Sequence, residues 1–214
     1  MASIDLKITL QAPLHIGTGS LTADGTATMT ARFARDARGR PCIPASMLKG
    51  VHRFSTEQIA AALGLPICGT PDASQMCHPT GGQAACVVCQ IFGSPWLPGK
   101  IHYRDLVVNV PLLTATRFVV PQSRRRRVQI ERRHLNYEVL PGGTQFTGRL
   151  DCQVQDSALL ALMLAGLRSI TRIGGGGAAG YGLCTVDALA FDVANRPVDE
   201  AELADALRRL VKQP

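Results

Sequence analysis

Aliphatic and polar residues alternate at the start of the chain. Between residues 4 and 10 every second residue is aliphatic, and Asp5, Lys7 and Thr9 lie between them. A period of two predicts a strand with one buried face. Further extended stretches cover residues 26–35, 101–109, 135–140, 145–154 and 182–192. In the stretch 145–154, Phe146 and Leu150 are expected to face inward.

Three segments have the apolar period of amphipathic helices. The first covers residues 45–63, with Ser46 as its expected N-cap, and the second covers residues 157–172, with Ser157 as its cap. A shorter helix is predicted over residues 200–211. Helices that cover one face of an antiparallel sheet give an α+β layer arrangement. At 214 residues the chain fits a single domain, residues 1–214.

An irregular insertion at residues 66–95 contains four cysteines in a Gly/Pro-rich setting. These are Cys68, Cys77, Cys86 and Cys89. Zinc prefers four thiolate or imidazole ligands in a tetrahedron, and a CxxC pair supplies two of them from one turn. His78 is a possible substitute for one cysteine. Four thiolates leave no open position for water, so the spacing predicts a structural zinc site.

The remaining three cysteines, Cys42, Cys152 and Cys184, lie in strand-like contexts and are expected in the core. The longest apolar run, residues 158–166, is too short to span a bilayer. No secretory signal is recognised at the start of the sequence. We therefore expect a cytoplasmic protein with no membrane partner, in which cysteines stay reduced or bind metal.

Positive charge is concentrated in one part of the chain. The net charge is +7, and residues 117–133 include seven arginines against a single acid, Glu131. Such clustering is typical of phosphate contacts. The polarity of residues 113–136 predicts a projecting hairpin or loop. Aromatic residues make up only 5% of the chain, so stacking on rows of aromatic rings is not the expected mode of RNA binding.

A glycine-rich stretch follows the second long helix. It comprises residues 174–177 and 180–182, with Arg168 and Arg172 just upstream. Glycine lets the backbone approach a ligand closely, and successive amides can form an anion-binding nest. The stretch lacks the Gly-Lys-Ser/Thr of a nucleotide-cleaving P-loop. It is therefore either a loop that binds the backbone of a polymer or a flexible turn.

Several segments, taken together and in order, resemble one family. Residues 15–19 (His-Ile-Gly-Thr-Gly) are similar to the opening motif of the repeat-associated mysterious proteins, the RAMP superfamily of CRISPR effectors. Residues 40–53 resemble its "Pro-x-Ile-Pro-Gly-Ser-Ser-Leu-Lys-Gly-x-x-Arg" motif. Residues 86–93 resemble the zinc-bearing insertion that precedes "Leu-Phe-Gly", residues 137–146 a later strand-turn-strand, and the glycine stretch the family's glycine-rich segment.

The resemblance is closest to the backbone subunit of type III complexes, the Cas seven family. It implies a ferredoxin-like, RRM-type palm with an antiparallel sheet, a zinc-binding insertion and a projecting β-hairpin thumb at residues 113–136. It also implies that several copies polymerise along a guide CRISPR RNA and present it to a complementary target RNA. The partners are then the guide, the target, further copies of the chain and other CRISPR effector subunits.

Such a subunit must bind ribose and phosphate while the bases stay free to pair. The helix start at Ser46 offers amides and a positive dipole to phosphate, and Lys49 and Arg53 lie one turn apart beside it. The expected RNA-binding residues are His15, Ser46, Lys49, Arg53, Arg124, Arg125, Arg126, Arg127, Arg132, Arg133, Arg168, Arg172, Gly174, Gly175, Gly176, Gly177, Gly180 and Tyr181.

Cleaving members of the family carry an aspartate between the first strand and the "Ile-Pro-Gly-Ser" helix, and the resemblance places Thr30 there. A threonine hydroxyl is uncharged and holds a divalent metal poorly. We therefore expect a subunit that binds RNA without cutting it. The alternative is a metal-dependent endoribonuclease that uses Asp24 and Mg²⁺, although Asp24 and Asp36 also suit ordinary turns. A further alternative is a zinc-stabilised interaction module that does not bind RNA.

Overall fold

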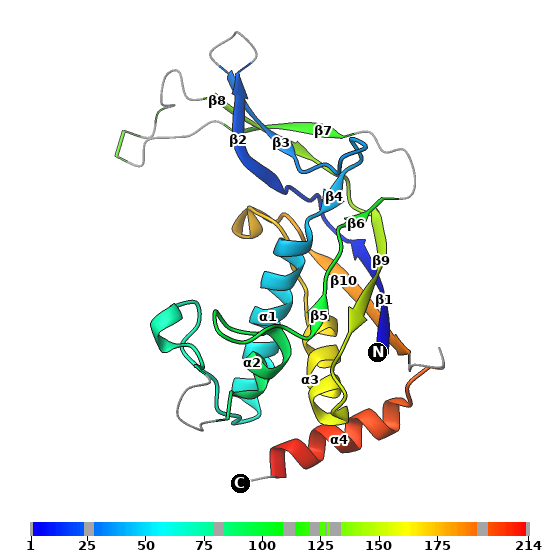
Figure 1. Cartoon of the computed structure of the whole chain (residues 1–214). Coiled ribbons are helices and arrows are strands. Elements are labelled where there is room, and N and C mark those ends of the chain that lie inside the picture. The colour runs from blue at the N-terminus through cyan, green and yellow to red at the C-terminus, as the bar shows by residue number, and fades with distance from the viewer. Residues whose placement is uncertain are drawn as a thin grey trace.

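The computed structural model describes residues 2–23, 28–78, 84–108, 114–119, 125–126, 128, 134–191 and 197–212. These residues form a large antiparallel sheet, a second, smaller sheet and four α-helices (Figure 1). The predicted α+β class is confirmed. None of the helices formed by these residues has both the length and the apolarity needed to cross a membrane.

In the large sheet, β1 lies between β10 and β9 and is antiparallel to both. Its strands, in spatial order, are β10 (Cys184–Phe191), β1 (Ala2–Leu10), β9 (Gln145–Cys152), β6 (Leu106–Val107) and β4 (Cys42–Ile43), and β5 (Ile101–His102) pairs with β9. When the two-residue β4 is left out and β5 and β6 are counted as one interrupted strand, the chain order of β1, α1 (Ala45–Ala62), β5/β6, β9, α3 (Ser157–Arg168) and β10 is strand, helix, strand, strand, helix, strand. This is the predicted ferredoxin-like palm.

The alternating pattern of the first strand produces one apolar face of this sheet. Ile4 pairs with Leu150 and Ile8 with Phe146 across β1 and β9, and all four side chains are fully buried. Phe146 and Leu150 therefore face inward as predicted. The three cysteines expected in the core, Cys42, Cys152 and Cys184, are also buried.

Helices cover the apolar face. They are α1 (Ala45–Ala62) and α3 (Ser157–Arg168). The short α2 (Val87–Phe92) packs on α1, and α4 (Glu200–Lys212) packs on α3 at the bottom of Figure 1. Leu162 and Leu167 of α3 are fully buried. Gly166 lets α3 approach α1 closely, because a Cβ there would lie 2.0 Å from Thr56 Oγ1.

The caps of the two long helices differ from the sequence prediction. The N-cap of α1 is Pro44, whose hydrocarbon side chain cannot accept a hydrogen bond, and Ser46 lies inside the first turn. The Ala45 amide instead donates to Asp105 Oδ1 at 2.8 Å. Asp156, not Ser157, caps α3 by accepting hydrogen bonds from two amides of its first turn. Carboxylates at both positions also suit the positive end of the helix dipole.

The C-terminal end of α3 was also predicted wrongly. The helix ends at Arg168, and Arg172 lies in extended chain, bridged to Leu183. The spacing of four residues between Arg168 and Arg172 therefore does not place them on one helix face.

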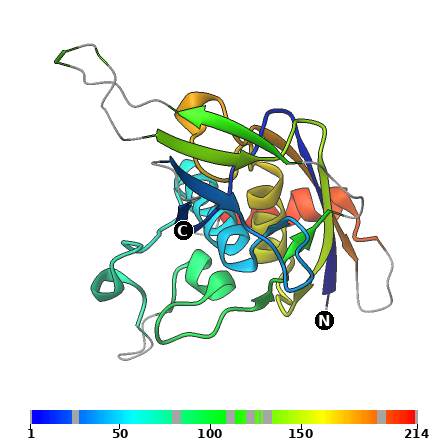
Figure 2. The same ribbon diagram turned by 90° about the horizontal axis from the view of Figure 1, so that it is seen from above.

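The second sheet lies above the palm in Figure 1. Its order is β2 (Gly17–Ala23), β3 (Thr28–Phe33), β8 (His134–Val139) and β7 (Ala115–Val119), with β3 and β8 parallel and the other pairs antiparallel. Figure 2 shows β7 (green) and β8 (yellow-green) side by side. β7 and the first residues of β8 lie within residues 113–136, which the sequence predicted as a projecting hairpin or loop. The residues that connect the two strands lie largely outside the described residues, and β2 and β3 extend the sheet that the pair forms.

The stretch predicted as one strand over residues 101–109 is split into β5 and β6. The residues between them turn away from the ladder to make other contacts: Asp105 caps α1, and the Tyr103 hydroxyl reaches His52 Nδ1 at 2.7 Å. His52 is fully buried, and its Nε2–H donates to the Met163 carbonyl at 2.9 Å. Nδ1 is then the acceptor for Tyr103. Burial lowers the pKa of His52 from 6.5 to about 4, so the ring is neutral at pH 7.

We expect His52 to make the stability of the fold depend on pH. Because its pKa is lower in the folded state, the unfolded chain binds more protons once the pH falls below 6.5. Its contribution is complete above pH 6.5 and is lost as the pH falls through 4, by about 3 kcal/mol in total. Urea unfolding at pH 7 and pH 4.5 measures this loss. His52→Gln keeps a donor and an acceptor but does not titrate, so it should lose less stability; an equal loss would contradict the assignment.

Candidate metal centre and anion-binding loop

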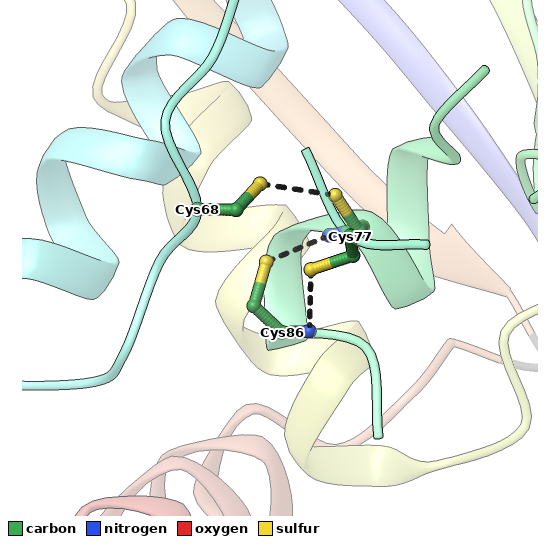
Figure 3. A group of neighbouring side chains, drawn as sticks. Cys68, Cys77 and Cys86 are labelled. Carbon is green, nitrogen blue, oxygen red and sulfur yellow. Dashed lines mark hydrogen bonds between the residues drawn. The ribbon is translucent and has the colours of Figure 1, made fainter. Parts of the chain in front are cut away.

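The four cysteines of the insertion meet at one point. The Sγ atoms of Cys68, Cys77, Cys86 and Cys89 all lie within 4.8 Å of one another. Figure 3 shows the side chains of Cys68, Cys77 and Cys86 directed toward one another from separate segments of the chain. Cys89 joins them from the first turn of α2. In a zinc–tetrathiolate centre with Zn–S bonds of about 2.3 Å, neighbouring sulfurs are about 3.8 Å apart. The donor set and the spacing therefore fit zinc.

Backbone amides also point at these sulfurs. The amide of Cys86 donates to Cys77 Sγ at 3.3 Å, and the amide of Cys89 donates to Cys86 Sγ at 3.5 Å. Burial raises the pKa of the Cys89 thiol well above its ordinary value, so metal binding must displace a proton there. When bound, the ion would cross-link the segments that carry the ligands. His78 is not in the group of four; its ring packs edge-on against Trp96, with centroids 4.4 Å apart.

Arg53 faces this centre. Its Nε donates to Glu57 Oε1 at 2.9 Å, Nη1 to the Gly93 carbonyl at 2.8 Å, and Nη2 to Cys89 Sγ at 3.3 Å. The sequence predicted that Arg53 and Lys49 both contact an RNA phosphate at the start of this helix. In the structure its guanidinium is directed toward residues 89–93, whereas Lys49 is exposed.

The glycine-rich stretch forms an exposed loop between α3 and β10. In Figure 1 it is the gold loop below the second sheet. The amide of Gly175 donates to the His15 carbonyl at 3.0 Å, and the amide of Gly182 donates to the Pro13 carbonyl at 2.8 Å. These two hydrogen bonds fix the loop to the chain just before β2.

The backbone of the loop leaves several amides unused. Gly174, Gly176, Gly180 and Gly182 all have φ between +73° and +86°. Within the described part of the chain, no backbone hydrogen bond is donated by the amides of Gly174, Gly176, Gly177 and Ala178. The same residues are exposed to solvent. Consecutive amides that lack acceptors are the feature that makes such loops bind anions.

The two arginines near the loop have different surroundings. Arg172 Nη1 donates to the carbonyls of Gly177 and Tyr181, both at 3.3 Å, so its side chain lies along the loop. No carboxylate among the described residues pairs with it in an ion pair of 4 Å or less. Arg168 instead pairs with Glu200 of α4 at 2.6 Å and donates to the Ala188 carbonyl. This pairing lowers the pKa of Glu200, so the ion pair is fully charged at pH 7.

Two other residues expected at the RNA support the loop from within. His15 is buried, its Nδ1–H donates to the Glu138 carbonyl at 2.7 Å, and its ring packs edge-on against Tyr137. The half-buried ring of Tyr181 lies against Gly176, where a Cβ would come within 2.6 Å of it. The Tyr181 contact shapes the loop directly, whereas the His15 ring holds residue 15, whose carbonyl accepts from the Gly175 amide, against β8.

Part of the predicted arginine cluster is described. Arg125 and Arg126 are exposed. Asp24, Arg124, Arg127, Arg132 and Arg133 lie outside the described residues.

The remaining acidic candidate has a structural role. The Asp36 carboxylate accepts hydrogen bonds from the amides of Arg38 and Arg40 and forms an ion pair with the Arg40 side chain at 2.8 Å. The Arg40 backbone hydrogen bond is the main cause that lowers the pKa of Asp36. Asp36 is thus the turn residue that the sequence suggested. Thr30 lies in β3, with Thr22 of β2 and Asn136 of β8 as its partners in register.

Three residues of these sites were not recognised in the sequence: Glu57, Thr70 and Asp105. Asp105 is 60 residues away from the amide it caps, and Thr70 is 13 residues from Glu57, whose carboxylate it contacts at 2.8 Å. No spacing rule connects residues so far apart, so the sequence contains no signal for either contact.

The sequence model of the RAMP superfamily matches residues 7–185. This match covers most of the chain, from β1 to the start of β10, and the chain belongs to the RAMP superfamily. Proteins of this superfamily generally bind RNA and assemble in CRISPR complexes. No curated protein matches the chain.

Proposed function

We propose that this chain is a backbone subunit of a class 1, type III-like CRISPR ribonucleoprotein complex in antiviral defence. It binds guide CRISPR RNA through the ribose-phosphate backbone. Further copies polymerise along the guide beside other effector subunits, and the guide is presented to complementary target RNA. The complex works in the cytoplasm, and zinc has a structural part in it.

The glycine loop carries this proposal. Its four amides without backbone acceptors lie beside Arg172, a cation without a carboxylate partner among the described residues. Amides and a guanidinium bind phosphate oxygens well and read no base. A guide that must pair with its target along its length needs contacts of this kind.

The open face of the large sheet is less suited to RNA. In RRM domains, aromatic rings on that face stack on bases. Here the corresponding positions of β1, β9 and β10 include Asp5, Asp151 and Asp187, whose charge repels phosphate. Arg149 on this face is already paired with Asp5 at 2.6 Å. The acidic residues of this face therefore favour the glycine loop, and not the sheet, as the main RNA contact.

The start of α1 supplies a second phosphate contact in this proposal. Asp105 occupies the amide of Ala45, so that amide is not available to phosphate. The amides of Ser46 and Met47 in the same turn and the exposed Lys49 remain beside it, whereas the Leu48 amide already donates to the Pro44 carbonyl at 3.0 Å. Of the predicted arginines, Arg53 and Arg168 are left out, because their guanidinium groups are bound within the protein. The exposed Arg125 and Arg126 of the proposed thumb remain among the proposed RNA contacts.

The proposed subunit binds RNA without cutting it. The partners of Thr30 in register are a threonine and an asparagine, neither of which is a good proton acceptor or ligand for Mg²⁺. The carboxylate of Asp36 is held by its own turn. Asp24 lies outside the described residues, so nothing described favours the nuclease alternative.

We expect Arg172→Ala to weaken guide RNA binding and to reduce its dependence on salt. One lost phosphate contact lowers the slope of log K against log salt by about 0.7 for single-stranded RNA. Fluorescence anisotropy with a labelled guide RNA, at several salt concentrations, measures both quantities.

Arg149→Ala is the matched control, because it also removes one arginine but from the acidic sheet face. It should leave the affinity and the slope nearly unchanged. Binding by the wild type that does not respond to salt would reject an RNA-backbone role and favour the zinc-stabilised interaction module. Equal effects of the two substitutions would reject the loop as the contact site.

A further inference from the structure

Arg53 and Glu57 form an ion pair on α1 that touches the metal centre from two directions. Arg53 reaches Cys89 Sγ and the Gly93 carbonyl, which belong to the segment that carries the CxxC pair. Glu57 Oε1 accepts a hydrogen bond from Thr70 Oγ1 at 2.8 Å, two residues after Cys68. A single turn of α1 thus contacts two of the three segments that supply the cysteines, the one that follows Cys68 and the one that includes Cys89.

We propose that Arg53 is a positioning residue for the metal centre, assisted by Glu57, and that it raises the affinity of the four cysteines for zinc. This inference rests on zinc as the occupant of the cysteine cluster. It does not depend on RNA binding, so it can fail or succeed independently of the proposed function.

The geometry requires arginine. The side chain makes three contacts in three directions, through Nε, Nη1 and Nη2, and is only 16% exposed. A lysine ammonium is a point charge on a flexible stem and cannot reproduce this fork. The three acceptors are atoms of Glu57, Gly93 and Cys89. The guanidinium therefore fixes the position of Cys89 relative to α1, which carries both Arg53 and Glu57.

The negative charge of a zinc centre with four thiolates is a second reason to expect that Arg53 raises the affinity for zinc. Zn²⁺ with four thiolates has a net charge of −2, and a partly buried negative charge is costly unless donors surround it. Two backbone amides already donate to Cys77 and Cys86. Arg53 supplies the donor to Cys89, the most buried of the four cysteines. A hydrogen bond from a charged donor is also stronger than one from an amide.

The test is the zinc affinity of purified variants, measured by competition with a chelator of known affinity. Arg53→Gln and Arg53→Lys are expected to bind zinc about 10–100-fold more weakly than the wild type, the range found for partners that orient metal ligands. Thr70→Val removes the contact to Glu57 without changing α1 and should weaken binding by a smaller factor. Arg104→Lys is the matched control, because Arg104 pairs with Asp151 away from the cysteines.

Two further measurements separate positioning from a general loss of structure or from an RNA contact. Circular dichroism at saturating zinc should show that the variants are folded, and the absorption spectrum of the cobalt-substituted protein should report a distorted thiolate centre in Arg53→Gln. The salt slope of RNA binding at saturating zinc should equal that of the wild type. The proposal is overturned if the wild type binds no zinc, or if the Arg53 variants and Thr70→Val bind zinc as tightly as the wild type.

Discussion

Removal of zinc is expected to unfold the insertion at residues 66–95 and to destabilise the domain. Because α2 buries Val88, Ile91 and Phe92 in the core, the insertion cannot come apart without exposing apolar surface. A ligand present at 1,000 times its dissociation constant contributes about 4 kcal/mol to stability, which corresponds to a shift in Tm of roughly 8–16 °C for a chain of this size. Thermal unfolding before and after chelation, with zinc content determined by mass spectrometry, measures the effect.

Cys86→Ser is the substitution that tests the same prediction most directly. Cys86 is both a proposed ligand and the N-cap of α2, and its Sγ accepts from the Cys89 amide. Serine is a good N-cap but a poor zinc ligand. The variant therefore removes the metal contact while it preserves the cap. Cys42→Ala, at a buried cysteine outside the cluster, is the control and should retain zinc. A Cys86→Ser protein that melts like the wild type would show that the cluster has no structural metal.

Gly182→Ala is expected to disrupt the glycine loop and to lower stability by roughly 2–6 kcal/mol. The residue has φ +76°, and a Cβ would lie 1.9 Å from the Ile173 carbonyl oxygen. Left-handed backbone strain and steric overlap in packed structure each cost about 1–3 kcal/mol. The Gly182 amide also anchors the loop to Pro13. Urea unfolding should therefore show a lower midpoint, and guide RNA should bind more weakly because the amides of the loop are displaced.

Two other glycines of the same loop separate the effect of left-handed backbone strain from that of steric overlap. Gly180 also has a left-handed φ, +86°, but a Cβ there would meet nothing within 4 Å. Gly180→Ala should cost only about 1–3 kcal/mol, from strain alone. Gly175 has neither a left-handed φ nor a close neighbour, so Gly175→Ala should leave stability nearly unchanged. If all three variants had the same stability, the loop would not have the backbone described here.

Much of the local structure could be predicted because the signals are short in range. The alternation between residues 4 and 10 fixes which face of β1 is buried, and the four cysteines define a candidate metal site by residue type and spacing. The boundary of α3 could not be read in the same way. Ser157 and Asp156 are adjacent and both suit a cap, so only the observed hydrogen bonds decide between them.

The sequence was enough to predict the α+β class, most strands and the two long helices of the palm, the cysteine cluster and the family motifs. What each arginine binds depends on the tertiary structure. It directs Arg53 to Cys89 and Arg168 to Glu200, and leaves Arg172 along the exposed loop. The physical reason is that strand and helix periods arise between residues a few positions apart. A guanidinium, by contrast, takes whichever acceptor the folded chain brings within about 3 Å, and these acceptors come from segments up to 40 residues away.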